Sequence, residues 1–275
     1  MPWDFALLVL LLGVVVPWRS AVRMRQLLRL PATTSQQRLI LYAGTMAAQW
    51  LLAGFALWRA LAHGIAPRAL GLALDYPAST LAITVPLCGM MAALQIYGLR
   101  RLARLPAGQQ GYAGVLARKL MPQNPLEALA FVALAATVAV CEEFLYRGFL
   151  LAAFAGAIGA GAAGAGGDTL GAAAQAASGT LILAGALSTL LFALGHLYQG
   201  VRGVVSTFVL GLVFCALRIA TGSLVPCVAI HFGVDLVAGL AAPRLLSAAS
   251  GDQDASAQQD PAPPAGQSTA QQKPV

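Results

Sequence analysis

Long runs of apolar residues, separated by short polar stretches, are the main pattern of this chain. Several runs approach or exceed the ~20 residues with which a helix crosses ~30 Å of hydrocarbon. Because lipid offers no hydrogen-bond partner to an unpaired strand, runs of this kind are helices. The pattern predicts an all-α fold, a polytopic transmembrane helical bundle of about seven spans. We expect these spans at residues 5–18, 38–61, 78–99, 126–158, 181–198, 203–220 and 224–246.

Four segments depart from a simple series of spans. Residues 5–18 are short for a span, so an interfacial position is an alternative for them. Residues 126–158 are too long for one span, so we expect a break or a continuation along the surface. Residues 156–179 are rich in Gly and Ala and predict a long loop. Residues 247–275 are rich in Gln, Pro, Asp and Ser and predict a disordered tail.

Composition agrees with a membrane protein. The 275 residues are 59% hydrophobic and 10% charged, whereas soluble domains have about 25% charged residues. The formal charge of +7 comes largely from two clusters, five arginines within residues 19–38 and five basic residues within residues 100–119. Both clusters fall on one side of the membrane if spans 38–61 and 78–99 form a hairpin. The positive-inside rule makes that side cytoplasmic, so no nucleic-acid partner is needed to explain the charge.

The same rule predicts that the tail is cytoplasmic. The bias toward Ala, Gly, Leu and Arg is typical of a bacterial chain, so we expect an integral protein of the bacterial inner (cytoplasmic) membrane.

Ionisable groups inside membrane helices are costly, by about 2.5 kcal/mol or more each, so every exception is informative. Arg218 lies near a span end, and we expect it to extend its guanidinium to the interface. Among the remaining ionisable residues in the apolar runs from residue 126 onward are Glu142, Glu143, Arg147, His196, His231 and Asp235.

The spacing of these residues is regular. Glu143 and Arg147 are four residues apart, as are His231 and Asp235, so each pair shares one helix face. Glu142 lies about 100° around the helix from Glu143 and can face a different space. Structural alternatives remain open: an ion pair that only fixes helix packing, an interfacial His196, and a hydrogen-bonded His231–Asp235 pair. Phe192 is expected to serve packing.

The depths of His196 and His231 in the membrane argue against a shared site if their spans are vertical. In vertical spans His196 lies about 24 Å from the outer end of its span, and His231 lies about 10 Å from the outer end of its own. A tilt, a shortened span or a re-entrant segment around residues 199–222 is needed to bring the two histidines together.

Three motifs occur in order: EEFLYR at 142–147, FALGH at 192–196 and HFGVD at 231–235. They match the patterns E-E-x-x-x-R, F-x-x-x-H and H-x-x-x-N/D. In these the chain resembles the CPBP (Abi) family of intramembrane proteases, which includes type 2 CAAX prenyl endopeptidases, lysostaphin-resistance-like proteins and bacteriocin-immunity proteins. The resemblance divides the chain into N-terminal spans with basic cytoplasmic loops (1–119), a protease core (120–246) and the tail (247–275).

The resemblance implies an endopeptidase and a role for each motif residue. Glu142 is the general base on water, His196 assists it, and His231 with the residue at 235 stabilises the oxyanion. Glu143 stays ionised against Arg147, and Arg147 and Phe192 are structural. The catalytic residues are therefore expected to be Glu142, Glu143, His196, His231 and Asp235.

The mechanism has two versions at this stage. One needs no cofactor. The other is a metalloprotease in which zinc is held by Glu142, His196, His231 and Asp235. An ionised Asp235 favours metal, because a carboxylate cannot donate a hydrogen bond to an oxyanion whereas an asparagine could.

The expected substrate is a membrane-associated peptide or protein, such as a prenylated CaaX chain, and the bilayer is the other partner. A non-catalytic immunity or chaperone-like protein and a proton-coupled transporter are the alternatives, because buried ionisable groups also mark ion pathways.

Overall fold

The computed structural model describes residues 1–106, 109–162 and 170–258, and all regular structure in these ranges is helical. Seven helical stretches are long and apolar enough to cross a membrane, which confirms the prediction of an all-α polytopic bundle. They are Trp3–Arg29, Ser35–Ala62, Pro77–Ala103, Pro125–Gly159, Ser178–Gly195, Leu197–Thr221 and Val225–Leu246.

The first stretch joins α1 (Trp3–Leu10), a short π-helical segment η1 (Leu11–Val15) and α2 (Val16–Arg29). It is longer than the apolar run 5–18 because the helix continues through the polar residues that follow. Leu8 and Leu12 are almost fully buried in the main hydrophobic core. This stretch is therefore packed into the bundle, unlike a segment lying at the interface.

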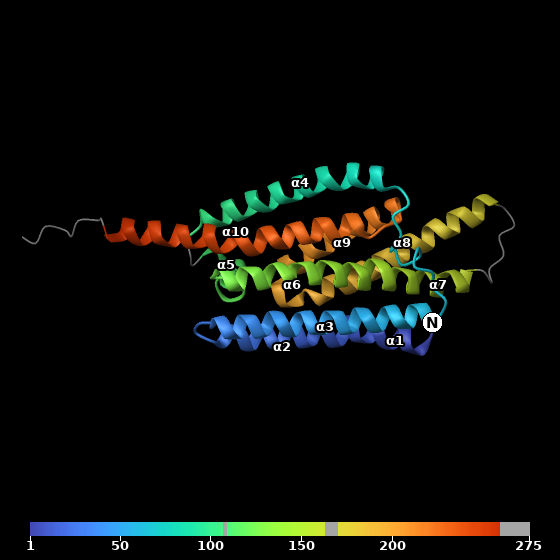
Figure 1. The fold of residues 1–275 in the computed structure, drawn as a ribbon, viewed down its shortest axis with the longest axis horizontal. Coiled ribbons are helices and arrows are strands. Elements are labelled where there is room, and N and C mark those ends of the chain that lie inside the picture. The colour runs from blue at the N-terminus through green and yellow to red at the C-terminus, as the bar shows by residue number, and fades with distance from the viewer. Residues whose placement is uncertain (107–108, 163–169, 259–275) are drawn as a thin grey trace, which may run out of the picture.

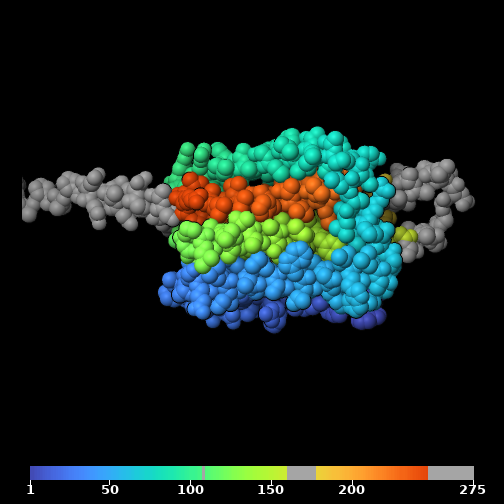
Figure 2. Space-filling model, in the orientation of Figure 1, coloured from blue at the N-terminus to red at the C-terminus, as the bar shows by residue number. Residues whose placement is uncertain are grey.

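The chain returns through α3 (Ser35–Ala62), whose first turn is fixed by a capping box between Thr34 and Gln37. After α4 (Pro77–Ala103) and α5 (Gly111–Leu120), α6 (Pro125–Glu143) begins with the side chain of Asn124 as its cap. Figure 1 shows α10 lying between α4 and α6, with α3 on the far side of α6. The same order appears as bands on the surface in Figure 2.

The overlong run 126–158 is interrupted. α6 passes into a π-helical segment, η3 (Phe144–Leu150), and continues as α7 (Leu151–Ala162). All seven residues of η3 are buried. The widened turn changes which side chains face the core, so this stretch is one helix whose two halves present different faces.

The second half contains α8 (Leu170–Gly195), the 3₁₀ turn η5 (Leu197–Gln199), α9 (Gly200–Thr221) and α10 (Val225–Gln258). The loop expected at 156–179 is wrong at both ends, because α7 extends to Ala162 and α8 begins at Leu170. Alanine is the strongest helix former and outweighs the glycines there. Residues 163–169 lie outside the described residues.

The tail expected from residue 247 also differs. α10 continues to Gln258, since the segment after Leu246 is rich in alanine, and residues 259–275 lie outside the described residues. The expected division of the chain at residue 119 stays a prediction.

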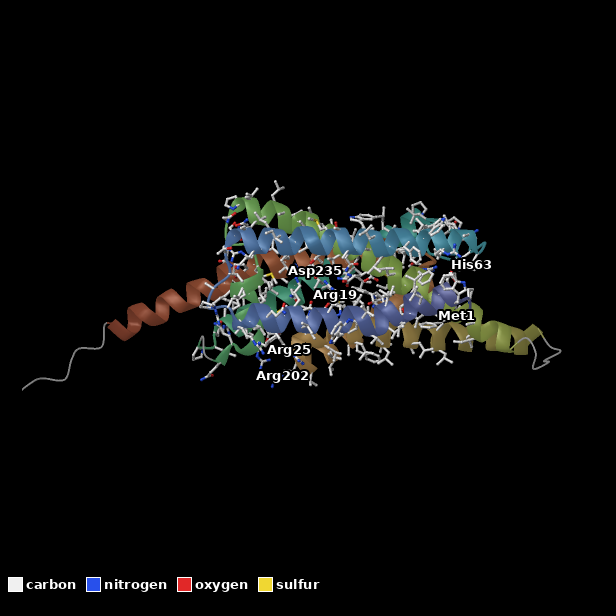
Figure 3. The ribbon with its side chains drawn as sticks, turned by 90° about the horizontal axis from the view of Figure 1, so that it is seen from below. Met1, Arg19, Arg25, His63, Arg202 and Asp235 are labelled. Carbon is white, nitrogen blue, oxygen red and sulfur yellow. The ribbon has the colours of Figure 1, made fainter. Side chains whose placement is uncertain are left out.

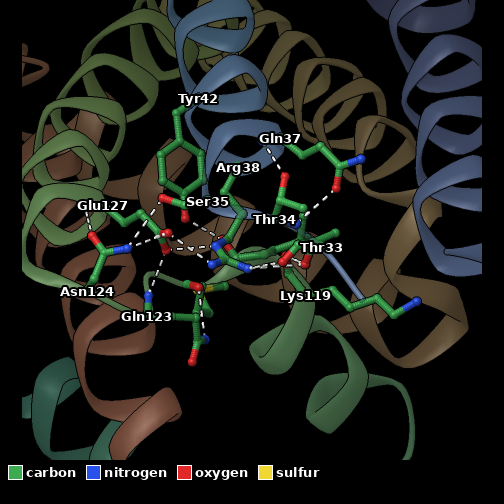
Figure 4. A network of polar contacts seen from close by, with 12 residues as sticks. Thr33, Thr34, Ser35, Gln37, Arg38, Tyr42, Lys119, Gln123, Asn124 and Glu127 are labelled. Carbon is green, nitrogen blue, oxygen red and sulfur yellow. Dashed lines mark hydrogen bonds and ion pairs between the residues drawn. The ribbon is translucent and has the colours of Figure 1, made fainter. Parts of the chain in front are cut away.

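A buried ion pair joins α3 to α6 at one end of the bundle (Figure 4). Arg38 donates through Nε and Nη2 to the two carboxylate oxygens of Glu127, at 2.7 and 2.9 Å. Glu127 also accepts from Asn124 and from the backbone of Gln123. Lys119 donates to backbone carbonyls at the end of α2. These contacts hold the end of the first span and the starts of α3 and α6 at one end of the bundle.

The opposite end is crossed by residues 63–76, which we call the crossing loop. In Figure 2 it runs over the end of the bundle between α3 and α4. Leu70 is fully buried, and the backbone N–H of Leu224 donates to the carbonyl of Gly71 at 2.9 Å. Figure 3 places His63 and Met1 at this end and Arg25 and Arg202 at the other. The two basic clusters, residues 19–38 and 100–119, therefore gather toward the end opposite to the crossing loop, whereas Arg68 lies in that loop.

Candidate active site

The two adjacent glutamates lie where α6 changes into η3. Glu142 and Glu143 are the last two residues of α6, and Arg147 lies within η3. π-Helical turns are rare in proteins, and those that occur are often found at functional sites. Ser188 on α8 donates to the carbonyl of Tyr146 at 2.5 Å, which satisfies a backbone group inside the irregular turn.

Glu143 is completely buried and binds two cationic or hydrogen-bonding partners through one oxygen. Its Oε1 accepts from Arg147 Nη1 at 3.3 Å and from His231 Nδ1 at 2.7 Å. The Nδ1–H of His231 is therefore committed to Glu143, which leaves Nε2 as the ring atom available for chemistry. The pairs Glu143–Arg147 and His231–Asp235, which the spacing treats separately, form one connected group.

Arg147 packs against two aromatic rings and against the backbone of α9. Its guanidinium lies 4.0 Å from the centre of the Phe192 ring and 5.5 Å from that of Phe214. A Cβ added at Gly211 on α9 would lie 2.8 Å from Arg147 Nη2 and from Thr189 Cγ2. This close approach of α9 to η3 explains why a glycine stands at position 211.

Glu142 is only partly buried and faces a different space. Its Oε1 accepts from Gln49 Nε2 on α3 at 2.8 Å. Its Oε2 is a buried atom that has no hydrogen-bond partner among residues 1–106, 109–162 and 170–258. The Glu142 charge acts on Tyr198, His231 and Asp235, so these groups share its surroundings.

His196 stands directly after the end of α8. Its Nδ1 lies 2.8 Å from the carbonyl of Phe192, which accepts the ring N–H and leaves Nε2 free. The imidazole stacks on the Tyr198 ring at 5.9 Å between centroids. The short turn at residues 196–199 thus orients His196 through both a backbone and a ring contact.

The Phe192 ring lies between the two histidines. Its centroid is 4.7 Å from that of His196 and 6.2 Å from that of His231. Asp235 interacts electrostatically with both imidazoles. In Figure 1 the turn between α8 and α9 lies well inside the end of the bundle at which α3 begins. α8 ends at Gly195, before the expected end of its span at 198, and the chain turns there, which places His196 against the same Phe192 ring that His231 contacts.

Asp235 is half-buried. Its Oδ2 lies 3.6 Å from His231 Nε2, beyond ordinary hydrogen-bond length, and its side chain is 33% exposed. The structure therefore brings Glu142, Glu143, His196, His231 and Asp235 into one region around Phe192, with Arg147 beneath it. Their catalytic roles stay predictions.

Gln49 is the contact that sequence reasoning missed. It comes from the second span and is not ionisable, whereas the predicted site consists of ionisable residues from residue 126 onward. A neutral amide inside an apolar run was the available signal, because buried amides need partners.

The zinc hypothesis requires several side chains to reach one point. Among the described residues no group of three His, Cys, Asp or Glu side chains is arranged to hold a metal ion. His231 Nδ1 is engaged by Glu143, and Oε1 of Glu142 is engaged by Gln49. The donor set does not fit a zinc site in this arrangement, and we derive no step through a metal.

The fold and the site define a class: a polytopic helical membrane protein with a buried cluster of acids and histidines. Residues 124–237 match the model of the family described as type II CAAX prenyl endopeptidase Rce1-like. Over these residues the chain is similar to that family, and all three motifs lie within the matched range. No curated protein and no solved structure matches the chain.

Proposed function

We propose that the chain is an intramembrane endopeptidase in which Glu142 is the general base. The observation that carries this proposal is the unpartnered Oε2 of Glu142, a buried carboxylate oxygen in the region of two histidines with free Nε2 atoms. A carboxylate with an unused oxygen in a largely dry place can accept a proton from water. The match of residues 124–237 to the model of a prenyl endopeptidase family supports the same reading.

The first chemical step is attack of water on the carbonyl carbon of the scissile peptide. Glu142 takes one proton from the water, and the new C–O bond forms as the carbonyl becomes a tetrahedral oxyanion. His196 orients the water through Nε2, since its Nδ1–H is directed to the Phe192 carbonyl. The C–N bond then breaks, and the proton held by Glu142 passes to the leaving amine.

The oxyanion needs a hydrogen-bond donor that is already in place. We assign that role to Nε2 of His231, because Nδ1 is already bound to the Glu143 carboxylate and Nε2 donates a hydrogen bond when the ring carries both protons. Asp235 lies beside Nε2 and contributes a donor only when it carries a proton. Glu143 and Arg147 are positioning residues in this scheme.

The substrate is a membrane-associated peptide or protein. A prenylated CaaX chain is the natural first choice, because the matching family is described as prenyl endopeptidase. The metal-dependent version and the non-catalytic and transport alternatives are separated from this proposal by one experiment.

That experiment measures cleavage of a farnesylated CaaX peptide and of membrane-tethered peptides by the purified protein in liposomes. Glu142→Gln should reduce cleavage by about a hundredfold to ten-thousandfold, the range of general acid–base effects. A chelator should leave wild-type cleavage unchanged. Loss of cleavage with chelator and its return with zinc would establish the metal version. Absence of cleavage by the wild type, with solute flux unaffected by Glu142→Ala, would favour a carrier.

We also propose the orientation. The end that bears Arg25 and Arg202 is cytoplasmic, since the basic residues gather there (Figure 3). In an inner membrane the crossing loop then faces the opposite compartment. Site-specific labelling of a cysteine introduced at Arg202 or at His63 in sealed vesicles separates the two orientations.

A further inference from the structure

A cavity lies at the end of the bundle that carries the crossing loop. It has a volume of about 590 Å³, within the range of ligand sites in proteins. Its walls are mostly apolar and come from α1, α7, α8 and α9, and the crossing loop contributes Arg68 and Ala69. Met1, which lines the cavity, stands at that end of the molecule in Figure 3. This cavity shares no residue with the cluster around Phe192.

Arg218 lines this cavity and does not reach the interface as the sequence predicted. It is 7% exposed, and its Nη2 donates to the carbonyl of Ala69 at 2.8 Å. Its Nε is buried and has no hydrogen-bond partner in the part of the chain that the structure describes. The crossing loop prevents the outward extension, since a Cβ at Gly71 would lie 2.4 Å from Nε.

The charge of Arg218 is uncompensated by any described acidic side chain. No described Asp or Glu side chain lies within ion-pair distance of its guanidinium. The last turn of α9 and the Ala69 carbonyl supply only partial negative charge. An arginine does not lose its proton in proteins, and a buried cation without an anion is costly. The second arginine of the cavity, Arg68, pairs with Asp75 at 2.7 Å.

We propose that this cavity is a binding site for an anionic phospholipid, with its phosphate at Arg218 and an acyl chain along the apolar wall of α7 and α8. The phosphate supplies the anion that the protein lacks, and the wall residues are small, among them Ala152, Ala155 and Gly156. Small side chains leave room for a chain to lie against the helix. A lipid satisfies both requirements because it joins an anion to a long apolar tail.

Native mass spectrometry of the full-length protein, exchanged into mixed phosphatidylglycerol and phosphatidylcholine, measures the bound lipid directly. We expect phosphatidylglycerol to be retained over phosphatidylcholine. Arg218→Met should reduce that retention by about fivefold, the loss expected for one basic contact to an anionic lipid. Arg202→Met, which removes an exposed arginine at the other end of the bundle, should not change it.

A second variant tests the same site independently, in case Arg218→Met does not fold. A Cβ at Gly156 meets nothing within 4 Å, so Gly156→Leu can fill part of the cavity without a clash. Loss of bound phosphatidylglycerol in both variants, with Arg202→Met unchanged, supports the site. Equal retention in Gly156→Leu and wild type overturns it. Equal loss of both lipids in Arg218→Met, or recovery of a free fatty acid as the bound species, overturns the phospholipid assignment.

Discussion

At the scale of single residues, the candidate site depends on which atom of each side chain is already engaged. Glu143 Oε1 and His231 Nδ1 are hydrogen-bonded to each other. Glu142 Oε2 and His196 Nε2, in contrast, have no hydrogen-bond partner among the described residues. The motif spacing predicts neighbours within one helix, because residues four apart share a face. It does not predict which atoms meet across helices, since that depends on how α3, α8 and α10 pack.

Gln49 should position Glu142. Replacing Gln49 by Met removes the 2.8 Å hydrogen bond to Oε1, so Glu142 is free to rotate away from the substrate. We expect kcat to fall by about tenfold, the value of one hydrogen bond to a charged group, with little change in thermal stability. Gln36→Met, on the exposed start of the same helix, is the control. Equal kcat in Gln49→Met and wild type would remove Gln49 from the site.

Asp235 offers a direct test of the oxyanion model. Asparagine can donate a hydrogen bond where an ionised aspartate cannot, so Asp235→Asn should retain or raise kcat. Asp235→Leu should lower kcat by about a hundredfold if the position contributes a donor. Peptide cleavage in liposomes measures both variants. A large loss in Asp235→Asn would instead indicate that the negative charge itself is needed, as in a metal site.

At the scale of elements, the spans were predictable and their irregularities were not. Apolar length alone identifies a span, since the bilayer imposes it. The π-helical turn at 144–150 has no such signature, because it follows from packing of η3 against α8 and α9. The Gly/Ala composition of residues 156–179 predicts a loop, whereas α7 and α8 extend into this segment.

Gly211 should be intolerant of a side chain because it lies against η3. A Cβ there would lie 2.8 Å from Arg147 Nη2 and 3.3 Å from Phe192 Cδ1. Gly211→Ala should therefore destabilise the protein by about 1 to 3 kcal/mol and lower cleavage by displacing Arg147. Thermal unfolding in detergent and peptide cleavage are the measurements. Gly89→Ala on α4, where a Cβ meets nothing within 4 Å, should be neutral.

At the scale of the whole molecule, the pair Arg38–Glu127 connects the N-terminal spans to the family-matched region. Arg38→Met leaves Glu127 buried without its cation, and such losses cost about 3 to 5 kcal/mol. We expect a clearly lower unfolding temperature for Arg38→Met, with partial recovery in the double variant Arg38→Met/Glu127→Gln. An unfolding temperature equal to that of the wild type in Arg38→Met would mean that the pair contributes no stability.

Some contacts of the candidate site cross the boundary of the matched region, so the matched region cannot be exchanged independently of the N-terminal spans. Residues 124–237 carry the three motifs, yet Glu142 takes a hydrogen bond from Gln49 and Glu127 takes two from Arg38. Exchange of the N-terminal spans for unrelated ones would remove both partners at once. We therefore expect a chimera to remain active only if it contains an amide side chain at position 49 and an arginine at position 38 together with the three motifs.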